Sequence, residues 1–76
     1  MSELQFIDDT KRHTVPTLAL QKDGDILVGY VWELVPGSLY EWEYQTLDGD
    51  PFVDIAHSKD EAMASLASMA VTLERT

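Results

Sequence analysis

The chain has 76 residues, enough for one domain spanning residues 1–76. Five Lys and Arg residues stand against fourteen Asp and Glu, giving a net charge of -9, and cysteine is absent. These numbers exclude a disulfide framework, a thiol enzyme and a cysteine-liganded zinc site, and they argue against direct binding of nucleic acid, which requires a basic surface.

Apolar and aromatic residues alternate with polar ones in several segments, a period that is typical of strands. Turn signals separate these segments at residues 22–25, 35–38 and 47–51, where Asp-Gly and Pro-Gly pairs favour tight loops. Four strands are therefore predicted at residues 14–21, 26–34, 39–46 and 52–57. Residues 4–7 are a candidate fifth strand, followed by a turn at residues 8–11.

The period changes at the C-terminal end. Ser58 and Glu61 have the spacing of a capping box, which predicts a helix over residues 59–74. Leu66, Met69 and Leu73 recur on one side of that helix. The expected fold class is α+β, an antiparallel β-meander of four strands, or five with residues 4–7, packed by one C-terminal α-helix.

The expected register between the second and third of these four strands depends on the loop at residues 36–38. A loop of odd length pairs Trp32 with Trp42 and Glu33 with Glu41. A two-residue Pro-Gly loop would instead pair Trp32 with Glu41. Because proline fits the primed hairpin turns poorly and the odd loop separates polar from apolar side chains, the odd loop is the prediction.

At the next turn, Asp48 and Gly49 as the two central residues pair Trp42 with Ile55 and Glu43 with Asp54. The sheet would then have one aromatic and aliphatic face, covered by the helix, and one acidic face. The expected acidic face carries Glu33, Glu41, Glu43 and Asp54, with Leu27 and Val31 among them.

Charge is distributed unevenly along the chain. Residues 23–58 contain eight acidic residues and neither Lys nor Arg. One interpretation is that this acidity only keeps the protein soluble. The alternative is a binding surface for a basic partner, since Glu41 and Glu43 lie two residues apart on one strand face, about 6.6 Å from each other. That pitch is comparable to neighbouring phosphates of a nucleic-acid strand. Glu33, Glu41, Glu43 and Asp54 are therefore the candidate partner-binding residues.

Other chemistry is less well supported by the sequence. The two Asp-Gly-Asp segments lack the glutamate that a calcium loop needs at its twelfth position. Asp54, His57 and Ser58 are close in sequence, but Ser58 is expected to cap the helix and Asp54 to face away from His57. We therefore expect no catalytic residues, no metal site and no cofactor.

The base-free segment and the four candidate acidic residues resemble the small acidic inhibitors that phages encode, including anti-CRISPR proteins and other nucleic-acid mimics. This is a class-level resemblance, and the class contains many unrelated folds. It implies a basic protein or a nucleoprotein complex as the partner. The order of strands and helix is also similar to small β-β-β-α modules, such as the antitoxin half of some toxin–antitoxin pairs.

The sequence thus predicts a small non-enzymatic acidic binding protein, an inhibitor that occupies a basic, nucleic-acid-binding surface of a partner. The alternative is a structural or assembly protein acting as a homodimer through its sheet edge or face. Neither a signal peptide nor a membrane span is expected, since apolar runs of about 20 residues are absent. The expected location is the cytoplasm, or the host cytoplasm if a phage encodes the chain.

Overall fold

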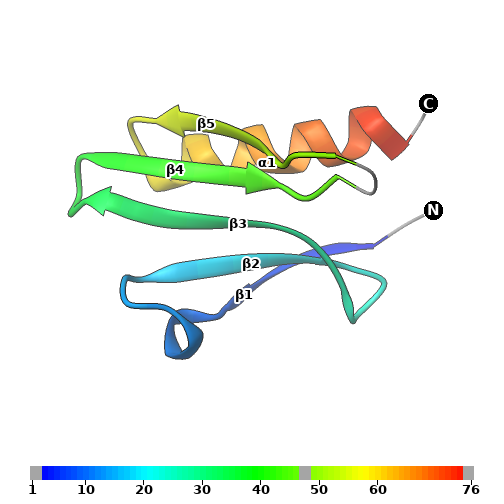
Figure 1. Ribbon diagram of the computed structural model, residues 1–76, viewed down its shortest axis with the longest axis horizontal. Helices are drawn as coiled ribbons and strands as arrows, with labels where there is room; N and C mark the ends of the chain where they lie inside the picture. The colour runs from blue at the N-terminus through cyan, green and yellow to red at the C-terminus, as the bar shows by residue number, and fades with distance from the viewer. Residues whose placement is uncertain (1–2, 47–48, 75–76) are drawn as a thin grey trace.

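A computed structural model describes residues 3–46 and 49–74, with residues 73 and 74 described by their backbone alone. Five antiparallel strands form one sheet in the order β1-β2-β3-β4-β5, and one helix follows them (Figure 1). The α+β meander predicted from the sequence is confirmed, and the candidate fifth strand is β1. The elements are β1 (Leu4–Asp8), the 3-10 turn η1 (Thr10–Arg12), β2 (Thr17–Lys22), β3 (Ile26–Val35), β4 (Leu39–Tyr44), β5 (Phe52–Ala56) and α1 (Lys59–Glu74).

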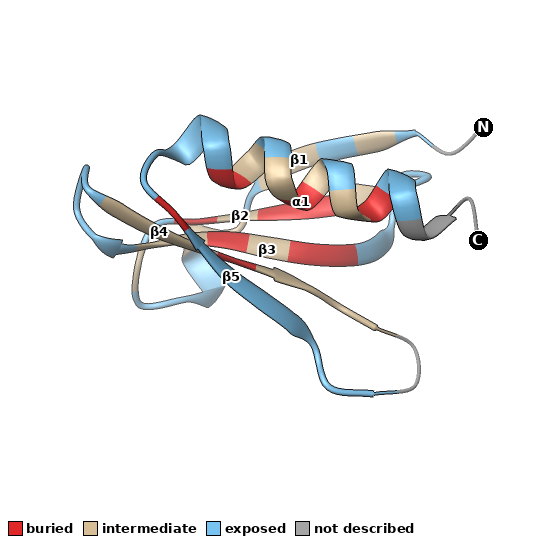
Figure 2. Cartoon of the chain, turned by 90° about the horizontal axis from the view of Figure 1, so that it is seen from above, coloured by how far each residue is buried: buried red, intermediate tan, exposed pale blue. Residues whose placement is uncertain are grey.

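Helix α1 lies along one face of the sheet, chiefly against β4 and β3 and less against β5 (Figure 2). Small residues on the helix allow a close approach, and Leu66 is fully buried between two buried alanines, Ala62 and Ala70. The helix begins as predicted, because the Ser58 hydroxyl accepts a hydrogen bond from the Glu61 amide at 3.1 Å. The predicted contribution of Leu73 to the core lies outside the described side chains.

Strand β2 begins at Thr17 and not at the predicted residue 14, because residues 10–15 form a 3-10 turn followed by bends. The turn η1 occupies Thr10–Arg12. The Thr10 hydroxyl then accepts a hydrogen bond from the Thr17 amide at 3.1 Å. Pro16 has no amide hydrogen to give to a neighbouring strand, which delays the start of the ladder.

The register predicted between β3 and β4 is wrong by one residue. Trp32 pairs with Glu41, and Val31 pairs with Trp42. Pro36 and Gly37 form a tight turn, which is closed by a hydrogen bond from the Ser38 amide to the Val35 carbonyl oxygen at 3.0 Å. Gly37 has a φ of 71°. These positions are those of a type II turn, which proline and glycine favour. A bulge between Glu33 and Val35 then takes up one residue of β3 and shifts every pair beyond it.

The register predicted between β4 and β5 is also wrong by one residue. Trp42 pairs with Asp54, and Glu43 pairs with Val53. The connection from β4 to β5 is longer than the predicted two-residue turn, and the Thr46 hydroxyl donates to the Gly49 carbonyl oxygen at 2.9 Å. Asp48, one of the two residues on which the prediction relied, lies outside the described residues.

Together the two shifts place polar and apolar residues on both faces of the sheet. We call the face under α1 the helix face and the other the open face. Val31, expected among the acidic residues, is buried in the core of the helix face with Leu20 and Trp42. Trp32, expected under the helix, lies on the open face instead, because neighbouring residues of a strand point to opposite sides.

Candidate binding surface on the open face of the sheet

The open face of β3, β4 and β5 carries three columns of side chains, one on each strand. The pairings place aromatic residues beside acidic ones, and acidic residues beside aliphatic ones. We call this surface the open-face array, and it consists of Tyr30 and Trp32 on β3, Glu41 and Glu43 on β4, and Val53 and Ile55 on β5. Directly opposed residues have Cβ atoms about 5 Å apart, so each carboxylate has an aromatic and an aliphatic neighbour on the same surface.

The aliphatic column is well exposed to solvent. Ile55 retains 51% and Val53 46% of its accessible surface. The aromatic and acidic columns are half-buried. Exposed apolar residues are common singly, but a contiguous set on one face is typical of an interaction surface.

The charge of the acidic column is not neutralised within the described part of the chain. Glu41 makes neither a hydrogen bond nor an ion pair through its side chain among these residues, and Glu43 accepts one hydrogen bond, from Gln45 Nε2 at 2.7 Å. The two carboxylates lie two residues apart on β4, roughly 7 Å from each other. The column therefore presents two negative charges next to apolar surface.

The segment that contains η1 borders the array on its β2 side. His13 packs edge-on against Tyr30, with ring centroids 5.2 Å apart. Asp9 holds this segment, because its carboxylate contacts His13 Nε2 at 2.9 Å and Arg12 Nε at 3.7 Å. The Arg12 charge is thus already paired with Asp9 and does not neutralise the acidic column.

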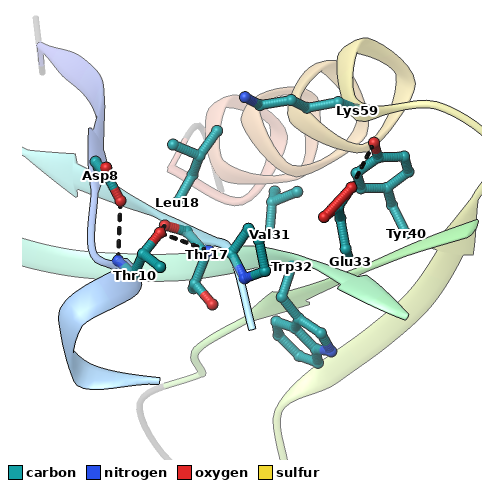
Figure 3. A pocket seen from close by; sticks show the side chains of 10 residues that line it. Asp8, Thr10, Thr17, Leu18, Val31, Trp32, Glu33, Tyr40 and Lys59 are labelled. Atoms are coloured by element: carbon teal, nitrogen blue, oxygen red, sulfur yellow. Dashed lines mark hydrogen bonds between the residues drawn. The ribbon is translucent and has the colours of Figure 1, made fainter. Parts of the chain in front are cut away.

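Glu33, a predicted partner-binding residue, is on the helix face and not with Glu41 and Glu43. Its Oε1 atom accepts hydrogen bonds from the Tyr40 hydroxyl at 3.2 Å and from the Gly37 amide at 3.3 Å. Burial and the adjacent Glu33 carboxylate raise the pKa of Tyr40 above its usual value. Glu33 therefore ties the β3–β4 turn to β4 and lines a groove of about 480 Å³ beside the start of α1 (Figure 3).

Asp54, the fourth predicted residue, is also separated from the acidic column. It pairs with Trp42 and therefore lies on the helix face of β5, where it is exposed. One of its carboxylate oxygens accepts a hydrogen bond from the Ile55 amide at 2.8 Å. The acidic face predicted from the sequence is thus split into two residues on each side of the sheet.

The sequence interpretation missed four members of the open-face array, the two aromatic and the two aliphatic residues. The turn leaves Val35 opposite Leu39, as the predicted loop of odd length requires, and the bulge between Glu33 and Val35 then brings Trp32 opposite Glu41. The sequence carries no clear signal for this bulge, so the turn residues alone could not have placed the aromatic pair on the open face.

Comparisons with protein-family models, curated proteins and solved structures give no significant match. Helix α1, in the part of the chain that the structure describes, is too short and too polar to cross a membrane. Among residues 3–46 and 49–74, groups of three or more His, Asp or Glu side chains that could hold a metal ion are absent.

Proposed function

We propose that this chain is a non-enzymatic acidic binding protein that covers a basic, nucleic-acid-binding surface of a partner protein or nucleoprotein complex with its open-face array. The observation that carries the proposal is the column of Glu41 and Glu43, which forms no ion pair with the residues that the structure describes and stands between aromatic and aliphatic columns. A partner with Lys or Arg side chains among apolar ones complements such a surface in charge and in polarity.

Arginine is the better complement to this array than lysine. A guanidinium can stack on the face of Trp32 while it donates two hydrogen bonds to the neighbouring Glu41. Val53 and Ile55 add apolar contact at the β5 side of the array. The net charge of -9 steers such a partner toward the protein from a distance.

Binding is a better proposal than catalysis for these carboxylates. General acid–base catalysis needs groups that converge on a substrate in a concave site. Glu41 and Glu43 do not line the groove beside α1, to which the open-face array contributes only Trp32. In this proposal the protein works in the cytoplasm, or in a host cytoplasm, as the small acidic inhibitors of phages do.

The test is capture of partners on the immobilised protein from an extract of the encoding organism, or of its host. We expect a nucleic-acid-binding protein that is retained at about 0.05 M salt, is lost as the salt rises, and is released by added nucleic acid. Nucleic acid releases it because both occupy the same basic surface. A captured protein that keeps its nucleic acid while bound to this chain would contradict the proposal.

A second candidate function is assembly of two copies through the sheet edge that β5 forms. It is an edge strand, and Phe52, Val53 and Ile55 are each about half-exposed. The exposed Asp54 carboxylate, which holds the Ile55 amide, opposes such pairing. Pairing through the open face would set identical carboxylates against each other. We therefore rank self-assembly second, and a sedimentation measurement of the mass in solution tests it.

A further inference from the structure

The groove beside the start of α1 has an apolar floor and an acidic residue at each end. Leu18 of β2 and Val31 of β3 form the floor, with Asp8 at one end and Glu33 at the other (Figure 3). Its volume of about 480 Å³ is within the range of small-molecule sites, roughly 300–1,000 Å³. The groove is therefore large enough for an aliphatic chain with a polar head.

The groove contains two carboxylates and one ammonium group, that of Lys59. Lys59 extends from the start of α1 over the groove, but an ion pair within 4.0 Å to either carboxylate is not formed among the described residues (Figure 3). Hydrogen bonds from Thr10 hold the pKa of Asp8 below its usual value, and the charges of Lys59 and Lys11 add to this. With two carboxylates and one ammonium group among its described lining residues, the groove has a formal net charge of about -1.

The carboxylates at the two ends of the groove differ in the protein groups that already interact with them. At the first end, Asp8 accepts a hydrogen bond from the Thr10 amide at 2.9 Å, and the charge of Lys59 helps to lower its pKa. At the second end, Glu33 accepts hydrogen bonds through Oε1, from the Tyr40 hydroxyl and the Gly37 amide. Hydrogen-bond donors to the second oxygen, Oε2, are not found among the described residues. Each carboxylate therefore keeps an oxygen that accepts no hydrogen bond from the described residues. The charges of Lys59 and Lys11 already act on Asp8, so the Glu33 end is the better place for a further cation.

We propose that this groove binds an organic cation, a primary ammonium or a guanidinium on an aliphatic stem. The head donates to the free oxygen of Glu33 beside the Tyr40 hydroxyl, and the stem lies on Leu18 and Val31. The single positive charge of the ligand neutralises the net negative charge of the groove. Such a cation could be a free aliphatic amine or the side chain of an Arg or Lys in another protein. The groove and the open-face array share Trp32 but neither carboxylate, so substitutions of Glu33 and of Glu43 test the two proposals separately.

The experiment is an NMR titration of the intact protein, with n-butylammonium and n-butylguanidinium as probes and n-butanol as the neutral control. We expect saturable shifts of the Leu18 and Val31 methyl signals with both cations and not with n-butanol. Glu33→Gln keeps the shape and acceptor oxygen of this side chain but removes its charge, so it should weaken binding about tenfold. Lys59→Gln should strengthen binding, because it removes the competing positive charge.

Glu43→Gln is the matched control, because it removes the same charge from the open face. It should leave the affinity for both cations within about twofold of the wild type, since exposed charges more than about 10 Å away are screened. Equal weakening by Glu43→Gln and Glu33→Gln would overturn the proposal, as would shifts that do not saturate or that n-butanol reproduces. Unchanged binding in Glu33→Gln would also overturn it.

Two further probes distinguish the sources of the cation. They are 1,4-diaminobutane and N-acetyl-arginine amide, which imitates an arginine within a protein chain. Tighter binding of the diamine supports the proposal with a free amine as the ligand, because Asp8 can take the second ammonium. Tighter binding of the arginine derivative supports it with a protein side chain as the ligand. Failure of both to compete with n-butylammonium would overturn the proposal.

Discussion

Gly29 has the least room of any glycine in the sheet. A Cβ atom at this position would collide with the carbonyl oxygen of Glu43 and would lie 2.9 Å from Leu66 Cδ1. Strand β4 and the helix therefore both approach the backbone of β3 at this point, which only glycine permits. The close contact of α1 with the sheet depends on this residue.

We expect Gly29→Ala to lower the free energy of unfolding by about 2 kcal/mol or more, because backbone atoms of β4 have to move. Gly49→Ala is the control, since the nearest atom to a Cβ there is 3.8 Å away. That variant should stay within about 0.5 kcal/mol of the wild type. Urea titration measures both, and equal stability of the two variants would contradict the packing described for β3.

Asp8 predicts a dependence of stability on pH. Its folded pKa is lowered by the hydrogen bonds from Thr10, so the ionised carboxylate stabilises the folded state above the unfolded pKa, which is about 3.9. This contribution is lost as the pH falls through the lowered folded value. Asp8→Asn should therefore be less stable than the wild type at pH 7, and the difference should shrink below about pH 4. Urea titrations across this range measure it, and a constant difference would refute the role given to the charge.

At the scale of elements, the sequence predicts well what depends on local patterns. The alternation of residues gives the strands, and Ser58 with Glu61 gives the start of the helix at the observed residue. Residues 10–16 were harder to predict, because a hydrogen bond between Thr10 and Thr17 determines where β2 begins. These local signals were sufficient for the order of the elements and for the fold class.

Register could not be predicted in the same way. A single bulged residue between Glu33 and Val35 leaves the turn and both strands in place but moves each pair by one position. The predicted register assumed that polar and apolar side chains separate completely between the two faces, and this assumption was wrong. The structure instead combines Trp32 with Glu41 on the open face and Glu33 with Tyr40 on the helix face. Two of the four predicted site residues therefore lie away from the acidic column.

Strand β5 is an edge strand with exposed apolar residues, and such a strand can pair with another chain unless a charge or bulge prevents it. Asp54 supplies a charge on this edge and an acceptor for the Ile55 amide. We expect Asp54→Val to associate in a concentration-dependent manner, since the strand would then be apolar throughout. Asp50→Val, which loses the same charge in the preceding loop, should remain like the wild type. Sedimentation velocity tests this, and a monomeric Asp54→Val protein would contradict it.

At the scale of the whole molecule, the cations of the described residues lie on other elements than the acidic column. Lys11 and Arg12 lie in η1, Lys22 lies at the end of β2, Lys59 lies at the start of α1, and the acidic column lies on β4. The open-face array thus joins an uncompensated negative charge to apolar surface. This combination gives both steering at a distance and contact at short range. The central claim is that this array, and not the net charge alone, binds the partner.

Replacing both carboxylates of the acidic column tests that claim most directly. The double variant Glu41→Gln with Glu43→Gln and the control Asp25→Asn with Asp50→Asn each change the net charge from -9 to -7. Both control residues are exposed and lie outside the array. The measurement is the affinity and association rate of the captured nucleic-acid-binding protein for each variant at about 0.15 M salt, where the Debye length is about 8 Å. We predict that the array variant binds about tenfold more weakly and associates more slowly, while the control remains within about twofold of the wild type. Equal binding by the two variants would contradict the account.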